Sequence, residues 1–417
     1  MDSSHELPIY SPSTPSPSYS QDPANDETRL NFSPRILVGA RPLPTGLFTK
    51  AYGSATVVLL DQEENTRVPS YRRRGTVRGS LILERDMGRI LEIVAKLEGL
   101  LETTTVESGT VTTKVFQRMD SIWSRGSSSS SSPCPGIIEF AFPFPAAFQH
   151  QGAEYPLPPS YAARFPGFPS LFARCTYSLT ISITKDARLL SKTKLIYLPI
   201  DYNPQTSPPR GITRTSCFLS GLKTMPEEWY QSSFTMNARS SSSLSPLQCQ
   251  VFLPSVQIFG IKDSIPLHVQ LSGSLATLQE FVLPCRPHPG NPEQNGHQNS
   301  PIRVYITRMV SVKYGTKTTW RLQRVGEGRF RALPPSANFA CDCQSACESS
   351  CLQILDWEGE VRCYPDVTVG GFQSLGLTLK DFITLELVPH KPASSALLTV
   401  QHAIPIRLVT ETFISPM

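Results

Sequence analysis

The stretch that decides the fold is residues 249–271, which read CQVFLPSVQIFGIKDSIPLHVQL. Apolar side chains occupy every second position from Ile265 to Leu271. A period of two places these aliphatic side chains on one face of a β-strand. The preceding run is also strand-like, but Pro254 lacks a backbone N–H and predicts an edge position, a bulge or a strand break. We therefore expect a β-hairpin whose apolar face is covered by a second sheet, as in a β-sandwich.

Composition limits the classes of partner. The chain has 417 residues, enough for two domains, and its net charge of +5 is too mild to indicate nucleic acid or a membrane as the main partner. No apolar run reaches the roughly 20 residues of a spanning helix, and the first ten residues, MDSSHELPIY, resemble no secretory signal. We expect a cytoplasmic protein with only peripheral membrane contact, whose ten cysteines are mostly reduced.

One apolar stretch, residues 90–101, fits two patterns. Ile90, Val94, Leu97 and Leu101 follow a helical stripe, whereas alternate residues from 91 to 97 fit a strand equally well. Gly99 and the threonine-rich run after it favour the strand.

The rest of the chain predicts an all-β protein of two consecutive immunoglobulin-like β-sandwiches. Residues 1–50 are rich in Ser and Pro and predict a disordered head. Short β-rich runs separated by turns follow, without a long amphipathic helix. Prolines near residue 204 and the serine run 240–243 predict a linker, so the sandwiches should span 51–239 and 247–413.

Several short motifs carry a family resemblance. The hairpin pattern F-x-P…GIKDSIPLHVQL, the segment from Phe140 to Pro145 and the run LPPSY at 157–161 resemble the fungal arrestin-like proteins of the arrestin superfamily. The resemblance covers about residues 50–412. It implies two arrestin-type β-sandwiches in a non-catalytic trafficking adaptor at the plasma membrane or endosomes. Such an adaptor links membrane-protein cargo tails to ubiquitination and endocytosis, and its partners include a WW-domain ubiquitin ligase.

Two proline-tyrosine motifs are candidates for binding a WW domain, which grips a preformed polyproline turn and a tyrosine. Leu7, Pro8 and Tyr10 lie in the predicted disordered head, where a linear motif is accessible. Pro158, Pro159 and Tyr161 match the stronger P-P-x-Y pattern. By the resemblance, however, this second segment belongs to the fold, so Tyr161 is expected in the core and Tyr10 is the preferred candidate.

A cysteine-rich segment is the candidate metal site. Cys341, Cys343, Cys347 and Cys351 could supply thiolates to a zinc ion, although structural zinc sites usually show two C-x-x-C pairs. Lipidation of these cysteines or ordinary loop thiols remain alternatives. No cofactor is predicted.

The basic run Arg72, Arg73 and Arg74 could contact phosphate on a cargo tail or an inositol lipid through bidentate guanidinium groups. A solvated loop between strands is the preferred interpretation.

Motifs of catalysis are missing from the sequence. It contains no G-x-S-x-G, H-E-x-x-H or P-loop pattern, and Gly326 and Gly328 are explained by a tight turn. His268 is interpreted as a structural residue on the polar face of the hairpin. We therefore expect no enzyme. The alternatives are a sorting or signalling scaffold without ligase recruitment, or a metal- or redox-responsive binding protein that uses the cysteines at 341–351.

Overall fold

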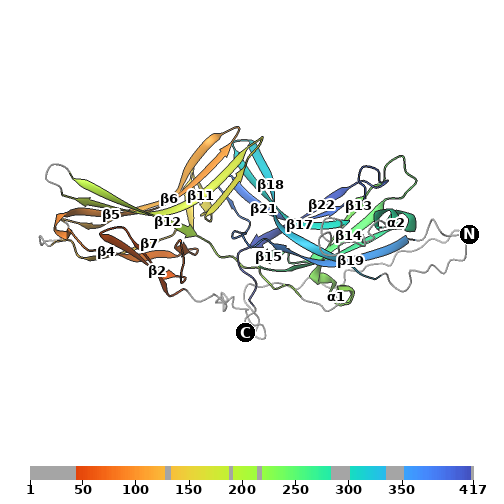
Figure 1. Ribbon diagram of the computed structural model, residues 1–417, viewed down its shortest axis with the longest axis horizontal. Helices are drawn as coiled ribbons and strands as arrows, with labels where there is room; N and C mark the ends of the chain where they lie inside the picture. Colours follow the sequence, from red (N-terminus) through yellow and green to blue (C-terminus); the bar gives the residue numbers. More distant parts are fainter. Residues whose placement is uncertain are drawn as a thin grey trace, which may run out of the picture. The chain divides into compact units, whose positions relative to one another are not determined.

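The computed structural model describes residues 44–126, 133–186, 191–213, 218–282, 301–334 and 352–414. All of them belong to one compact unit, Leu43–Ser415. Its described residues form mainly β-strands, arranged as two β-sandwiches with one hydrophobic core each (Figure 1). The predicted all-β fold of two sandwiches is confirmed.

The first sandwich packs a four-stranded sheet on a six-stranded one. The smaller sheet has the order β1 (Gly46–Ala51), β2 (Ala55–Gln62), β4 (Thr76–Leu83) and β7 (Ile137–Pro143). The larger sheet has the order β3 (Ser70–Tyr71), β12 (Lys192–Tyr202), β11 (Leu171–Lys185), β5 (Ile90–Thr105) and β6 (Gly109–Ser124), and β10 (Tyr161–Phe165) also pairs with β11. A short hairpin of β8 (Ala147–His150) and β9 (Ala153–Pro156) follows β7, and the turn η1 (Met87–Arg89) precedes β5.

Strand β5 settles the ambiguity of residues 90–101. Ile93, Ala95 and Leu97 are fully buried, while the residues between them are partly exposed, which is the period of a strand. Gly99 continues the buried face because a Cβ there would lie 2.4 Å from Cε1 of Tyr177. The preference for a strand is confirmed.

The second sandwich is formed by one continuous ten-stranded ladder, which divides at β18 into two halves that act as its two sheets. One sheet has the order β13 (Trp229–Met236), β14 (Leu247–Pro254), β16 (Ile265–Ser274) and β19 (Leu352–Cys363), and the helix α2 (Leu275–Val282) follows β16. The other contains β17 (Ile302–Tyr314), β21 (Leu377–Leu387), β22 (Val400–Val409) and β15 (Ile258–Gly260), with β20 (Gln373–Ser374) beside β21.

Strand β18 (Lys317–Ala332) connects these two sheets. Its first part pairs with β17 and its last part, from Gly326 onward, pairs with β19. A Cβ at Gly326 would lie 2.4 Å from the carbonyl oxygen of Arg362, and one at Gly328 would lie 2.3 Å from Cγ1 of Val304. The prediction of a tight turn at these glycines is wrong. They lie within the continuous strand β18. Because glycine has no side chain, they allow the backbone of β18 to approach its neighbours closely where β18 passes from one sheet to the other.

The stretch 249–271 forms the predicted antiparallel pair, but it is more than a hairpin. Strands β14 and β16 pair from Gln248 opposite Ser272 to Phe252 opposite His268. Pro254 ends β14, and residues 258–260 then form β15, which pairs in parallel with β22 of the other sheet. The connection therefore contributes to both sheets of the sandwich.

Two predicted boundaries need correction. Strand β1 begins at Gly46, inside the predicted head, and its Phe48 is buried in the first core. Strand β13 pairs along its whole length with β14, so the second sandwich includes Trp229–Met236 and does not begin at 247. The serine run 240–243 lies between these two paired strands and is no interdomain linker.

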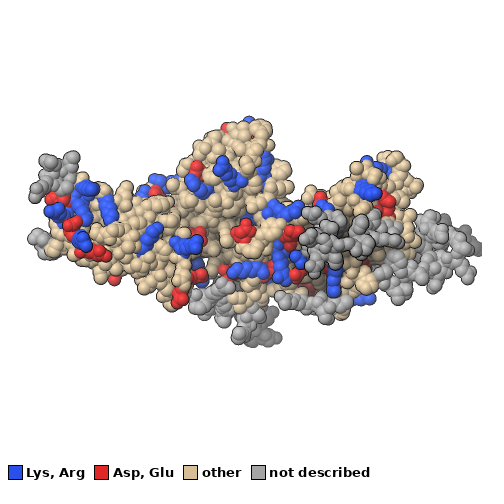
Figure 2. All heavy atoms as spheres, in the orientation of Figure 1, with Lys and Arg blue, Asp and Glu red and all other residues tan. Residues whose placement is uncertain are grey.

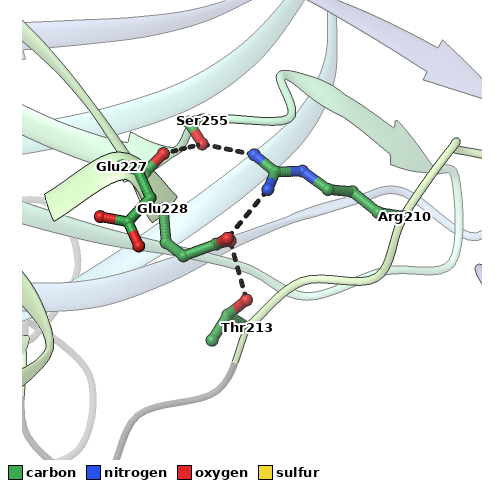
Figure 3. A network of polar contacts seen from close by, with 5 residues as sticks. All are labelled: Arg210, Thr213, Glu227, Glu228 and Ser255. Atoms are coloured by element: carbon green, nitrogen blue, oxygen red, sulfur yellow. Dashed lines mark hydrogen bonds and ion pairs between the residues drawn. The ribbon is translucent and has the colours of Figure 1, made fainter. Parts of the chain in front are cut away.

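The connection between the sandwiches follows β12, and its described segment 203–213 is hydrogen-bonded to the second sandwich. Arg210 donates to Glu228 (2.9 Å) and to Ser255 (2.6 Å), and Thr213 donates to the same Glu228 carboxylate (2.9 Å; Figure 3). The Ser255 hydroxyl donates in turn to the backbone carbonyl of Glu227 at 2.7 Å (Figure 3). This part of the connection is therefore positioned by specific hydrogen bonds, unlike a free tether. It continues into α1 (Phe218–Thr224) and the turn η2 (Pro226–Glu228).

Strands β17 and β21 serve both hydrophobic cores with one face. On β17, Ile306 lies in the second core, whereas Val310 and Val312 lie in the first. On β21, Leu379 lies in the first core and Ile383 in the second. Because alternate residues of a strand share a face, two cores meet along these strands. We call this boundary the seam.

Candidate partner-binding site

A buried ion pair lies at the seam. Arg308 of β17 and Asp381 of β21 are opposite each other, on the face that carries the apolar residues of both cores. The guanidinium donates from Nε to Oδ1 at 2.7 Å and from Nη2 to Oδ2 at 3.3 Å. The two side chains are 4% and 0% exposed. Bidentate geometry satisfies both charges and offsets part of the loss of hydration.

A cavity of about 430 Å³ opens beside this pair. Ser160, Tyr161 and Arg174 of the first sandwich line it together with Arg308 and Gln323 of the second. It could receive part of an extended chain or a small polar group, because its walls present hydroxyl, amide and guanidinium groups.

Tyr161 is held in this wall by an aromatic contact. Its ring packs edge-on against Phe372, with the centroids 5.9 Å apart. Burial raises the pKa of Tyr161 to about 12, opposed by the charge of Arg308 and assisted by that of Asp381. The phenol is therefore neutral at ordinary pH.

The P-P-x-Y segment containing Tyr161 is part of the first sandwich. Pro158 and Pro159 are buried. The Tyr177 hydroxyl donates to the Pro158 carbonyl at 2.5 Å, and Tyr161 pairs with Cys175 in the β10–β11 ladder. A WW domain needs access to the prolines as well as the tyrosine. In this fold, such access to the segment requires local unfolding.

The ends of three hairpins meet beside the seam, and we call them the tip cluster. They are the turns at 106–108, between β5 and β6, at 166–170, between β10 and β11, and at 315–316, between β17 and β18. Thr319 of β18 donates to the Glu107 carboxylate at 2.9 Å. Arg321 of β18 donates to the backbone carbonyl of Pro169. Each hairpin of the first sandwich is thus bound to the same strand of the second.

Large apolar side chains of the tip cluster are exposed. Phe168 is 88% exposed and Tyr314 56%, and Val106 is exposed as well. Trp320 is 51% exposed, but it lies on the opposite face of β18 from Thr319 and Arg321. The hydrogen bond from Thr319 lowers the pKa of Glu107, assisted by its backbone hydrogen bond. The cluster therefore combines exposed aromatic rings with a carboxylate anchored by a hydrogen bond, on strands that are paired close to their ends.

The basic run forms a turn. Arg73 and Arg74 are exposed, Arg74 has a positive φ of 58°, and Gly75 donates its backbone N–H to the carbonyl of Arg72 at 2.8 Å. Arg78 of the following strand forms an ion pair with Asp61 at 2.7 Å. The described surface drawn in Figure 2 mixes blue and red groups, without a broad area of one sign. A phosphate or lipid contact by this turn stays a prediction.

Other predicted residues lie outside the described part of the chain. These are Leu7, Pro8 and Tyr10 in the head and Cys341, Cys343, Cys347 and Cys351. Within the described residues, no group of three or more His, Cys, Asp or Glu side chains could hold a metal ion. No helix among those residues is long and apolar enough to cross a membrane. Burial raises the pKa of the Cys363 thiol to about 12, so this nearby cysteine is a poor metal ligand as it stands.

The seam pair was missed although the sequence carries a signal for it. Arg308 interrupts an apolar alternation that runs from Ile302 to Val312, and Asp381 interrupts another from Leu377 to Leu387. Opposite charges at apolar-face positions of two strands indicate a buried pair. The tip cluster has no comparable signal, because its turns are far apart in the sequence.

No family model matches the chain, and no curated protein sequence matches it. Among solved structures, the crystal structure of squid arrestin is similar to 87% of this chain and 97% of its own length, with a TM-score of 0.36 and 9% identity. The fungal form stays a prediction.

Proposed function

We propose that this protein is a non-catalytic adaptor that binds a partner protein on its tip cluster. The observation that supports this function is the meeting of three hairpin ends from two sandwiches, with Phe168 and Tyr314 exposed on them. Exposed apolar groups of this kind mark interaction surfaces, and aromatic residues dominate the binding energy of protein interfaces.

The anchoring of the tip cluster favours binding by a preformed surface. The hydrogen bonds of Thr319 and Arg321 connect the tips across the two sandwiches. A surface whose residues are already positioned loses less conformational entropy on binding. A partner that contacts all three tips would contact both sandwiches at once.

The groups of the seam cavity favour binding over chemistry. Burial raises the pKa of Cys175 to about 12, with a small opposing effect of its hydrogen bond with Tyr177, so its thiol is protonated. Ser160 accepts a hydrogen bond from the backbone N–H of Tyr202 at 2.8 Å. Tyr161 is neutral, as its raised pKa shows. The cavity therefore suits an extended segment of the partner beside the tips.

The identities of the partners are inferred from the sequence motifs. We propose membrane-protein cargo tails as the partner on the tip cluster and a WW-domain ubiquitin ligase as the partner of Leu7, Pro8 and Tyr10. The protein would then act in the cytoplasm, at the periphery of the plasma membrane or endosomes, and link cargo to ubiquitination and endocytosis. A scaffold of the same fold that recruits no ligase is the alternative.

Proximity labelling in the native cell tests both contacts separately. We expect Phe168→Ser combined with Tyr314→Ser to reduce labelling of membrane proteins by about tenfold, because two aromatic anchors are removed. The matched control is Leu195→Ser with Tyr197→Ser, which changes side chains that are 67% and 59% exposed on β12. If the tip variant and the control label the same membrane proteins as the unaltered chain, the tip cluster is not the cargo site.

The ligase contact has its own variant. We expect Tyr10→Ala to remove labelling of a WW-domain ligase while cargo labelling persists, because the tyrosine completes the WW ligand. Persistence of ligase labelling in this variant would contradict the assignment of Tyr10.

A further inference from the structure

The second sandwich exposes apolar side chains on the side of β18 that points away from the cores. Trp320 and Leu322 of this strand are 51% and 55% exposed. In the ladder, Leu322 lies opposite Met309 of β17, which alternates with the core residue Val310. Alternate residues of a strand point to opposite faces, and directly opposite residues of an antiparallel pair share a face. We call the surface that carries Trp320, Leu322 and Met309 the Trp320 face.

The apolar groups of this face continue across the sheet. Phe382 of β21 and Thr307 of β17 lie opposite each other, and Pro405 of β22 lies opposite Phe382. Pro405 is exposed, and Phe382 and Met309 are partly exposed. Apolar side chains are therefore accessible on four neighbouring strands. Apolar groups that gather in this way mark an interaction surface, unlike single exposed residues.

Three cations lie among these apolar groups. Lys380 is opposite Met309, Arg407 follows Pro405 by two positions, and Lys313 lies further along β17. All three are exposed, and none of them forms an ion pair with another described residue. Cations without a counter-charge beside an apolar surface favour an anionic partner.

The carboxylates of the same face, within the described residues of these four strands, are Glu327 and Glu386, at the far end from Lys313. Glu386 accepts a hydrogen bond from Tyr305 at 3.2 Å and lies 3.9 Å from Arg303, and Glu327 accepts from the hydroxyl of Tyr364 at 3.5 Å. A second copy of the chain would therefore bring only carboxylates that already have partners. A uniformly anionic lipid surface would meet these two carboxylates as well as the cations. A segment of limited length, with its own pattern of charge, fits the face better.

The position of the face within the sheet favours a helical segment. Strand β17 is paired on both sides, with β18 and β21, and β21 is paired with β17 and β22. The backbone groups at the centre of the face are therefore occupied, and a partner there contacts side chains. Amphipathic helices bury an apolar stripe against the face of a sheet. Acidic residues that border such a stripe would reach the cations.

We propose that the Trp320 face binds an amphipathic helix of a partner protein whose apolar stripe is bordered by acidic residues. The stripe covers Trp320 and Leu322, and the acidic residues pair with Lys380 and Arg407. Burial of the tryptophan supplies most of the affinity, and the charges select the sign of the partner. Because Trp320 lies on the opposite face of β18 from the hydrogen bonds of the tip cluster, this site does not depend on the proposed function.

Fluorescence anisotropy with two labelled helical peptides tests the proposal. The probes are ELLEELLEELLEEL and the same peptide with Lys at every Glu position, each added to the full chain. Both present the same apolar stripe, but their charges are opposite. We expect the chain to bind the acidic peptide about tenfold more tightly, because only this peptide complements the cations of the face. Equal affinity for the two peptides, or a preference for the basic one, would overturn the proposal.

Trp320→Ser combined with Leu322→Ser tests the apolar groups. We expect the affinity for the acidic peptide to fall by about tenfold, because the main contact area is lost. The matched control is Leu352→Ser with Ile354→Ser, which changes side chains that are 69% and 45% exposed on β19 and should leave the affinity unchanged. Trp320→Gln alone gives a second variant should the double change unfold. If the variant and its control bind the peptide equally, the helix does not lie on this face.

Lys380→Glu combined with Arg407→Glu tests the charges. We expect the affinity for the acidic peptide to fall by about tenfold and the affinity for the basic peptide to rise, because attraction and repulsion are exchanged. The control is Lys192→Glu with Lys223→Glu, which makes the same change of net charge at exposed positions of β12 and α1. If this control weakens binding to the same extent, net charge explains the preference and the proposed pairing is wrong.

Other occupants of the face would give different results. Binding of the unaltered chain, but not of Trp320→Ser with Leu322→Ser, to vesicles of phosphatidylcholine and phosphatidylserine would assign the face to a membrane. A dimer that becomes a monomer in this variant, measured by sedimentation velocity, would assign the face to a second copy. Either result would overturn the proposal of a partner helix. We expect the variant to change neither measurement.

Discussion

Two pairs of a basic side chain and a carboxylate lie in the sheets of the second sandwich. One is at the seam, and the other is at the aromatic box, where Phe218 packs against Trp229, Phe252 and His268. Arg308 and Asp381 share two hydrogen bonds and are almost fully buried. His268 is equally buried, but its partner Asp356 is 22% exposed and receives one hydrogen bond from it. Both pairs join neighbouring strands, and the seam pair is enclosed by two cores. In the described part of the chain, Nδ1 of His268 has no hydrogen-bond partner.

The difference concerns what surrounds each pair. At the seam, the strand face continues as apolar side chains in both directions, and both charged side chains are almost fully buried although Arg308 lines the seam cavity. A charge left alone there is poorly hydrated. At the box, the neighbouring ring is Phe218 of α1, and Asp356 keeps part of its surface exposed to solvent. Loss of one partner should therefore cost more stability at the seam than at the box.

The largest effect is expected for Asp381→Asn. This change leaves the Arg308 guanidinium buried without a carboxylate, and we expect the free energy of unfolding to fall by about 3–5 kcal/mol. Urea unfolding measures this quantity. The matched control is Arg78→Gln, which breaks the exposed Arg78–Asp61 pair and should change stability by no more than about 0.5 kcal/mol.

The double variant Arg308→Met with Asp381→Leu sharpens the same comparison. Because it removes both charges together, it should recover most of the stability lost in Asp381→Asn. If Asp381→Asn is no more destabilising than Arg78→Gln, the seam pair is not buried as described.

A smaller effect is expected at the aromatic box. Asp356→Asn keeps an acceptor for His268 but removes its charge, and we expect stability to fall by about 1 kcal/mol in the same urea assay. A loss as large as that of Asp381→Asn would mean that the two pairs do not differ in the way their surroundings indicate.

The smallest predicted effect is a pH dependence of the stability that is lost in Asp356→Asn. Burial raises the pKa of Asp356, but the hydrogen bonds from His268 and Gln270 and the charge of His268 outweigh it, so the pKa lies below its ordinary 3.8. Because the pKa of Asp356 is lower in the folded than in the unfolded chain, its ionised carboxylate stabilises the fold at pH values above the unfolded pKa. This stabilisation is lost as the pH falls through the folded pKa. The gap between the unaltered chain and Asp356→Asn should therefore narrow from about pH 5 to about pH 3. A constant gap would contradict this.

Much of the fold could be predicted from local patterns. The alternation from Ile265 to Leu271 correctly indicates a strand with one buried face, and Pro254 correctly indicates a strand break. The start of the second sandwich was misjudged because β13 pairs with a strand that follows it, and the serine run between them resembles a linker. The role of Gly326 and Gly328 was also misjudged, since a continuous strand that changes sheets has no distinct local signature.

The candidate sites were less predictable. The sequence placed His268 on the polar face of its strand, and by position alone that face opposes the core. It could not show that Phe218, 50 positions earlier in the chain, covers this histidine with an aromatic ring. Likewise, Thr319 and Glu107 are 212 positions apart, and only the packing of the sandwiches brings them within a hydrogen bond.

The sequence by itself determined that residues 249–271 form strands of a sandwich, because a period of two depends only on neighbouring side chains and the pleat of the backbone. It also determined which face of those strands is apolar. Only the tertiary structure decided that this stretch supplies both sheets through β14, β15 and β16, and that His268 on its polar face forms part of an aromatic box. The physical reason is that sheet order and side-chain contacts depend on distant segments, whose pairing local periodicity does not specify.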